Sequence, residues 1–305
     1  TNPIGGYDNN GKLTYGGDPS AMVDGDTVYL YTGHDVSTDQ EVNDKVYDID
    51  GWICYSTKDL VNWKYEGEIM SAKDISWATG STSAWAAQTV KHNGKYYFYY
   101  CTWDATSGNG QQSIGVAVSD SPTGPFKDLG KPVVSGKVTD FGTESSTWND
   151  IDPTVWNDDM ISVKDQNGDG KITGGTSTKT ADVIQKTSVT SYTEAPWLYR
   201  RQDANGNYYG KYYLFYASGW REGMSYATTD DLLNGEWSEG KEIARPNVTS
   251  NTNHMAVIDF KGKTYFIYTM VHLQVETDTA ELQISLNLSL MKTEVLMKYL
   301  RQQQA

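Results

Sequence analysis

Residues 18–35 read DPSAMVDGDTVYLYTGHD, and this stretch contains the pattern from which the fold can be inferred. An acidic residue and a proline come first, followed by an apolar run, the pair Asp24-Gly25 and a second apolar, aromatic run. An Asp-Gly pair between two such runs is typical of a tight β-hairpin. Proline lacks an N–H and forces its predecessor into an extended conformation, so we expect Asp18 where a strand ladder begins.

The same order of strands and turn recurs along the chain. Later units begin at Trp85, Asp152, Glu194 and His254, and further turns fall at Asn93-Gly94, Asn205-Gly206 and Lys261-Gly262. A unit of four short strands fits this spacing and is the blade of a β-propeller. The sequence therefore predicts an all-β, five-bladed β-propeller that forms a single domain over residues 1–305. The third unit is polar and rich in Gly and Thr after Asp152, which predicts a shortened or irregular blade.

Composition excludes several classes of partner. The chain has 25 Lys and Arg residues against 39 Asp and Glu, a net charge of −14. This charge disfavours nucleic acid and anionic membranes and suits neutral or cationic ligands. The 22 Tyr and 10 Trp residues provide flat faces of the kind that sugar-binding clefts use. Cys54 and Cys101 lie in strand-like runs, and we expect two buried free thiols.

The sequence leaves the cellular compartment open. It contains no run of 18 apolar residues, so no membrane span is predicted. The chain begins Thr-Asn-Pro without Met, which is consistent with a leader that has been removed or left out. Both the cytoplasm and secretion agree with these observations.

Three units begin with an acidic residue close to a proline: Asp18-Pro19, Asp152-Pro153 and Glu194 two residues before Pro196. At the starts of innermost strands, these carboxylates would converge at one mouth of the central channel. Convergent carboxylates repel one another, which raises at least one pKa and prepares a general acid beside a general base. Two carboxylates roughly 6.5 to 9.5 Å apart with a water between them are the equipment of an inverting glycosidase.

These segments resemble glycoside hydrolase family 43, which includes five-bladed β-xylosidases, α-L-arabinofuranosidases and arabinanases. The resemblance covers roughly residues 1 to 270 and rests on GDPSAMVDGDTVYLYTGHD, NDIDPTVW and YTEAPWLYRR. It implies that Asp18 is the general base and that Glu194 is the general acid. It also implies that Asp152 tunes the pKa of the acid and orients it.

Further roles follow from the same resemblance. AWAAQ implies that Trp85 forms an apolar wall of the sugar pocket, although a core position for this residue is an equal alternative. TGHD implies that His34 and Asp35 lie near the pocket rim. TNHMAV implies that His254 lies on the axis and helps to hold a hydrated divalent cation such as Ca²⁺.

A separate calcium-loop pattern, which does not depend on this resemblance, begins at Asp165. It lacks the closing Glu, so we expect a solvated loop there.

The resemblance stops after Thr269. Residues 271–305 contain no Gly, Pro or Trp, and they lack the sugar-contacting arginine that family members carry. We hypothesise a reading-frame shift near residues 269–271, with the last blade closed by strands such as ELQISLNLSL. Sequencing the gene tests this hypothesis: an intact frame in which close relatives share the tail would contradict it.

The sequence thus predicts an exo-acting, inverting glycosidase that releases terminal pentoses from xylo-oligosaccharides or arabinoxylan. The predicted activity is that of a β-D-xylosidase with α-L-arabinofuranosidase activity. Its partner would be a small oligosaccharide, with no organic cofactor, nucleic acid or membrane. An endo-arabinanase and a sugar-binding propeller without catalysis are the alternatives.

Overall fold

A computed structural model describes most of the chain, and almost all of its regular structure is β-strand. Within the described part, a single turn of 3₁₀ helix spans Ala72–Asp74, and no helix is long and apolar enough to cross a membrane. The described residues are 2–4, 6–37, 48–78, 80–81, 83–106, 111–135, 150–156, 189–203, 205–219, 222–232, 235–244, 253–274 and 283–292.

The described strands form four antiparallel four-stranded sheets and one small hairpin. The first sheet contains β4 (Ser20–Asp24), β5 (Thr27–Asp35), β6 (Ile49–Thr57) and β7 (Lys64–Ser71). The second contains β8 (Ala87–His92), β9 (Lys95–Asp104), β10 (Gln111–Ser119) and β11 (Lys127–Asp128). The third contains β12 (Tyr192–Gln202), β13 (Tyr208–Ser218), β14 (Gly223–Thr229) and β15 (Lys241–Ala244). The fourth contains β16 (Met255–Phe260), β17 (Lys263–Gln274), β18 (Gln283–Lys292) and β1 (Asn2–Ile4), and β2 (Gly6–Tyr7) pairs with β3 (Leu13–Thr14).

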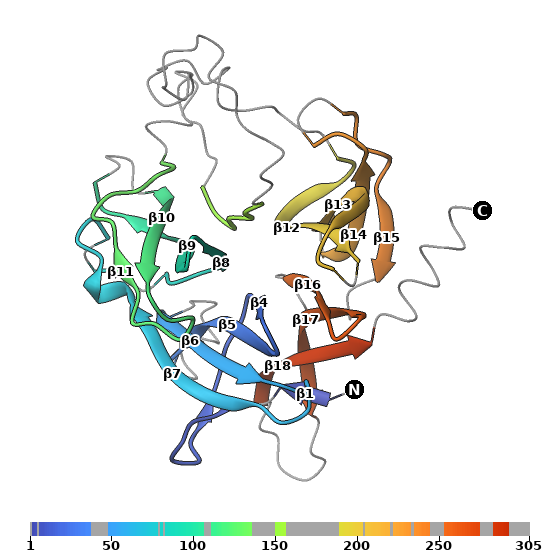
Figure 1. Cartoon of the computed structure of the whole chain (residues 1–305). Coiled ribbons are helices and arrows are strands. Elements are labelled where there is room, and N and C mark those ends of the chain that lie inside the picture. The colour runs from blue at the N-terminus through green and yellow to red at the C-terminus, as the bar shows by residue number, and fades with distance from the viewer. Residues whose placement is uncertain are drawn as a thin grey trace.

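The four-stranded sheets are arranged around a common centre, with β4, β8, β12 and β16 innermost (Figure 1). Strand β4 contacts both β8 and β16, and β16 contacts β12. Each predicted unit start except Asp152 leads directly into one of these inner strands or, for Glu194, lies within it. The repeat in the sequence is therefore the repeat of the sheets.

Residues 150–156, at the start of the third unit, lie between strands β8 and β12. The backbone N–H of Val155 donates to Oε1 of Gln88 on β8, at 2.5 Å. On the other side, the N–H of Leu198 on β12 donates to Oγ1 of Thr154, at 2.9 Å. Residues 150–156 therefore connect the two neighbouring inner strands. The rest of this unit, including the calcium-loop pattern at Asp165, lies outside the described residues.

Two of the predicted hairpin turns have the backbone that a two-residue turn requires. Asn93 and Gly94 have φ of 48° and 75°, and Lys261 and Gly262 have φ of 49° and 71°. Two successive residues with positive φ are characteristic of a type I′ turn, which matches the twist of the strands on either side. These turns confirm the strand boundaries that the sequence predicts.

Aromatic side chains fill the space between neighbouring sheets. Trp52 of the first sheet lies 5.4 Å, centroid to centroid, from Phe98 of the second sheet, and both side chains are fully buried. Phe215 of the third sheet lies 6.1 Å from Phe266 of the fourth. Burial of such rings dominates the energetics of a core. The high aromatic content therefore stabilises the contacts between sheets.

The N-terminal strand completes the sheet that contains β18. Strand β1 pairs with β18, with Pro3 opposite Ser289. Strand β18 in turn pairs with β17 along its whole length. The prediction that ELQISLNLSL supplies a strand of the last sheet is thus confirmed for residues 283–290, which belong to β18.

Close packing at Gly115 generates a stability prediction. A Cβ atom at Gly115 would overlap the ring of Tyr100 and lie 2.7 Å from Cζ2 of Trp77. Since both rings are buried, we expect Gly115→Ala to lower the free energy of unfolding by about 1–3 kcal/mol, measured by urea denaturation. Gly17→Ala is the matched control, because a Cβ there meets no atom within 4 Å. Equal losses of stability in the two variants would contradict the explanation.

Candidate active site

The predicted acidic residues come together around the centre of the molecule. Asp18 precedes β4, Asp152 lies in the segment between β8 and β12, and Glu194 lies in β12. Oδ2 of Asp152 accepts a hydrogen bond from the N–H of Ala195, at 2.9 Å. Burial raises the pKa of both Asp18 and Glu194, and the charge of Asp152 raises both further. The structure therefore places the three carboxyl groups within electrostatic reach of one another.

The backbone before each proline differs from the sequence-based expectation. Asp18, Asp152 and Ala195 have φ of 52°, 55° and 55°, so these residues are left-handed and not extended. Such a conformation in a residue other than glycine costs about 1–3 kcal/mol and persists where the surroundings fix it. In the third sheet, the pairing of β12 with β13 shifts register between Glu194 and Trp197. This bulge directs the N–H of Ala195 to Asp152 and away from the ladder.

Glu194 has the electrostatics of a general acid. Burial is the main cause that raises its pKa, to about 9, and the charges of Asp152, Glu222 and Asp18 add to the effect. A carboxyl group with this pKa is protonated at neutral pH. It can therefore donate a proton to a leaving group.

Asp18 has a different environment. Burial raises its pKa, but the His254 imidazole opposes this effect, with Nδ1 lying 3.8 Å from Oδ1 of Asp18. A protonated imidazole at this distance favours the ionised carboxylate. The side chain of Asp18 is 26% exposed, so water can reach it. This combination suits a general base.

Sequence reasoning missed a fourth carboxyl group, Glu222. This residue lies directly before β14, is only 1% exposed and forms a side-chain hydrogen bond with Glu194. Its Oε2 accepts a hydrogen bond from the N–H of Asn253, at 2.8 Å. Burial raises the pKa of Glu222 as well. No proline marks the position, so the only signal in the sequence is an acidic residue at the start of an apolar strand.

The other predicted binding residues make contacts within the sheets. Trp85 is half-buried against the core between the first two sheets, and its carbonyl oxygen accepts a hydrogen bond from Nε1 of Trp52 at 2.7 Å. His34 forms an ion pair with Asp50, with Nδ1 and Oδ1 3.1 Å apart. Oδ1 of Asp35 accepts a hydrogen bond from the N–H of Ser37, at 2.9 Å. Their predicted roles in sugar binding stay predictions.

The surroundings of His254 fit a metal ion only if water supplies most of the ligands. His254 is 7% exposed and faces the carboxylate of Asp18. Calcium takes six to eight oxygen ligands. Among the described residues, the group of three metal-ligating side chains with atoms within 4.8 Å of one another is His34, Asp50 and Glu68, and His254 is not part of it. A cation at His254 would therefore be a hydrated one.

Known proteins resemble this chain in sequence and structure. The family model described as glycosyl hydrolases family 43 matches residues 13–285. A xylosidase/arabinosidase from Bacteroides ovatus is 26% identical over an alignment of 306 positions, gaps included, which covers 83% of this chain and 85% of that protein. Xylosidase/arabinosidase 43A from Humicola insolens is 35% identical over 150 residues, which cover 48% of this chain and 41% of that protein.

A solved structure shows the same fold. It is CoXyl43, described as a GH43 β-xylosidase/α-arabinofuranosidase from a compost microbial metagenome in complex with xylotriose, in a calcium-free form. It matches with a TM-score of 0.65 at 22% identity and covers 95% of this chain and 94% of its own. This likeness confirms the predicted β-propeller class. The family match also runs to residue 285, beyond Thr269, where the sequence resemblance was expected to stop.

The raised pKa of Glu194 generates a prediction about stability. Between pH 4.5, the ordinary pKa of a glutamate, and about pH 9, the folded protein holds a proton that an unfolded chain releases. The stability contributed by this proton is therefore lost as pH rises through that range. Since Gln has no proton to lose, we expect Glu194→Gln to have little effect on Tm at pH 4.5 and to raise it by about 2 °C or more at pH 9.

Differential scanning calorimetry across this pH range provides the measurement. Glu239→Gln is the matched control, because it makes the same change at an exposed position. Its Tm difference from the wild type should not vary with pH. A Tm difference for Glu194→Gln that is also independent of pH would show that Glu194 is already ionised in the folded protein at low pH.

Proposed function

The chain belongs to glycoside hydrolase family 43, and from this premise we propose that it is an exo-acting, inverting glycosidase that releases terminal pentoses. We propose β-D-xylosidase activity with additional α-L-arabinofuranosidase activity on xylo-oligosaccharides or arabinoxylan. The observation that carries the proposal is the half-buried Glu194, whose raised pKa keeps its proton in place at neutral pH beside other carboxyl groups. A group of this kind is the general acid that glycoside cleavage requires.

In the proposed mechanism, Asp18 takes a proton from a water molecule as that water attacks the anomeric carbon. Glu194 gives its proton to the departing glycosidic oxygen, and the anomeric configuration inverts because attack and departure take place on opposite faces. Asp152 keeps Glu194 protonated through its negative charge, and it fixes the adjacent backbone by accepting the N–H of Ala195. The two proton transfers leave Asp18 protonated and Glu194 ionised, and exchange with solvent resets both.

The names of the relatives support a pentose substrate. Two of them are described as xylosidase/arabinosidases, and CoXyl43 is described in complex with xylotriose. In the proposed pocket, Trp85 provides an apolar face for the sugar, and His34 and Asp35 lie towards the rim. An endo-arabinanase is the second candidate function, since arabinanases occur among the family's activities. Sugar binding without catalysis is less favoured, because a protonated Glu194 is not needed for binding alone.

Hydrolysis of p-nitrophenyl β-D-xylopyranoside and p-nitrophenyl α-L-arabinofuranoside tests the proposal. We expect turnover of both by the wild type, and we expect Glu194→Gln to lower kcat by about 10²- to 10⁴-fold, since that is the range for loss of a general acid. Glu239→Gln should retain wild-type activity. The decrease in kcat caused by Glu194→Gln should be larger on xylobiose than on the p-nitrophenyl glycosides, because a sugar hydroxyl is a poorer leaving group than p-nitrophenol and depends more on protonation.

The first product identifies the stereochemistry. Proton NMR during hydrolysis of the β-xyloside should show α-xylose before mutarotation, because one displacement inverts the centre. Initial release of β-xylose would contradict the inverting mechanism. If the wild type hydrolysed neither glycoside, assays on linear arabinan would distinguish the endo-arabinanase from the protein that only binds sugar.

We also propose a hydrated divalent cation, Ca²⁺, held in part by His254. When bound, the ion would supply positive charge beneath the carboxyl groups. We expect EDTA to lower kcat/KM by about 10-fold or more and added Ca²⁺ to restore it, a size typical for loss of supporting contacts in metal sites. The activity of His254→Gln should not respond to EDTA. Full wild-type activity in EDTA would contradict the proposal.

A further inference from the structure

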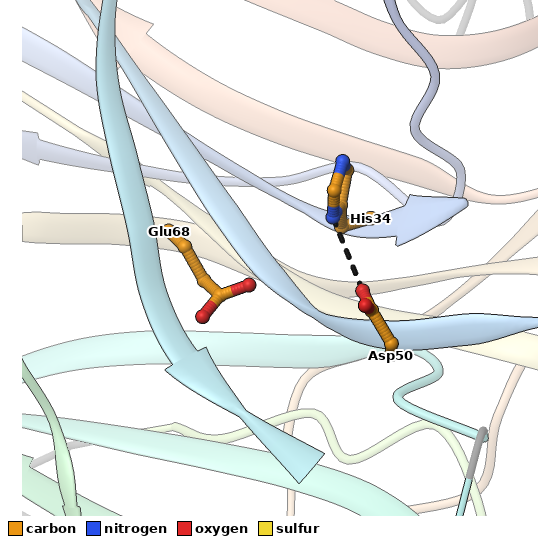
Figure 2. A group of neighbouring side chains, drawn as sticks. All are labelled: His34, Asp50 and Glu68. Carbon is orange, nitrogen blue, oxygen red and sulfur yellow. Dashed lines mark hydrogen bonds and ion pairs between the residues drawn. The ribbon is translucent and has the colours of Figure 1, made fainter. Parts of the chain in front are cut away.

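A second group of ionisable side chains lies away from the central carboxyl groups. His34 on β5, Asp50 on β6 and Glu68 on β7 come from three neighbouring strands of the first sheet and point toward one another (Figure 2). One possible ligand atom from each lies within 4.8 Å of the others. The three donors are therefore on a rigid sheet, where a site can be held precisely in place.

The local backbone provides the space for this group. His34 lies directly opposite Gly51, and a Cβ at Gly51 would be 3.2 Å from Oε2 of Glu68. Because Gly51 has no side chain, the carboxylate of Glu68 can lie over the backbone of β6. A register shift between Trp52 and Ile53 sets which β7 residues lie opposite this part of β6. Glycine and bulge together bring Glu68 to the His34–Asp50 pair.

The charges of the group are not balanced. Nδ1 of His34 lies 3.1 Å from Oδ1 of Asp50, so the imidazole pairs with this carboxylate and the carboxylate of Glu68 is not paired with it. Among the residues that the structure describes, the side-chain carboxylate of Glu68 has no hydrogen-bond or ion-pair partner. Two carboxylates and one imidazole would be neutralised by a single divalent cation.

We propose that His34, Asp50 and Glu68 form a binding site for a divalent transition-metal ion, with Zn²⁺ as the ion that fits best. Imidazole is a ligand that zinc accepts, whereas calcium and magnesium prefer oxygen ligands throughout. Three protein ligands with water in the fourth position form a common zinc geometry. His34 and Asp50 side chains are each 27% exposed, so an ion and its water can enter.

The site goes beyond the proposed hydrolysis and connects to it through the backbone. The N–H of Gly33 donates to the carbonyl of Gly17, at 3.2 Å, and Asp35 pairs with Tyr15. The end of β5 that carries His34 is thus bonded to the segment that leads into Asp18. A bound ion would hold β5, β6 and β7 together at this end. It would thereby also stabilise residues 15–17, which precede Asp18 and are bonded to β5. In this assignment His34 is a metal ligand, and Asp35 alone remains of the two residues proposed for the rim of the sugar pocket.

Zinc binding by the full chain tests the proposal without measuring hydrolysis, so its failure and the failure of the proposed function are distinguishable. After EDTA treatment and its removal, calorimetric titration with Zn²⁺ at pH 7.5 should show one site in the wild type. We expect Asp50→Asn and Glu68→Gln each to weaken this binding by about 100-fold, since each removes one of three ligands. Asp26→Asn is the matched control: it removes one exposed carboxylate of the same sheet, paired with Lys58, and should bind like the wild type.

Thermal unfolding gives an independent measurement. Zn²⁺ at about 100 times Kd should raise the Tm of the wild type and of Asp26→Asn by roughly 3 to 8 °C and leave Glu68→Gln unchanged. Glu68→Gln is the stricter variant, because no contact among the described residues is lost when its charge is removed. Unchanged zinc affinity in Asp50→Asn and Glu68→Gln, no binding by the wild type, or tighter binding of Ca²⁺ than of Zn²⁺ at these residues would each overturn the proposal.

Discussion

Mutual repulsion among closely placed carboxyl groups is the constraint on which the centre of this protein depends. Burial raises the pKa of Asp18, Glu194 and Glu222, and the charge of Asp152 raises all three further, whereas the His254 imidazole lowers the pKa of Asp18 and Glu222. The repulsion is relieved by keeping a proton on Glu194. Backbone N–H groups stabilise two of the remaining carboxylates. The proton that lowers this repulsion is therefore the proton that Glu194 would donate in the proposed mechanism.

This arrangement needs a rigid support, because the carboxyl groups are attached to a strained backbone. The left-handed residues before the prolines would relax to an extended conformation in an isolated strand. They are held by hydrogen bonds between inner strands, such as Ala195 to Asp152 and Val155 to Gln88. The aromatic contacts between sheets fix the inner strands in turn. Packing energy from the whole fold thus maintains the local strain at the site.

The sequence predicts the features that follow a repeat and misses those that depend on irregular pairing. Hairpin turns and the acid-proline motifs recur with the blade, so the fold class and the meeting of Asp18, Asp152 and Glu194 can be inferred. Glu222 is not part of an acid-proline motif, because its position depends on its hydrogen bonds with Asn253 and Glu194. The extended backbone conformation predicted before the prolines was also wrong, because a rule based on neighbouring residues cannot include tertiary hydrogen bonds. Glu68 likewise meets His34 through a bulge, which alternation along a strand does not predict.

The two acidic groups of the protein differ because they differ in access to water. Glu194 is half-buried and lies close to other carboxyl groups, so loss of solvation is the main cause that raises its pKa, and a proton removes its charge. Glu68 is exposed, and desolvation disfavours its charge less strongly. It lies beside an ion pair that already uses the one nearby imidazole. Two carboxylates and an imidazole from three adjacent strands can hold a metal ion together, so in the two proposals carboxyl groups act as an acid at the centre and as metal ligands in the first sheet.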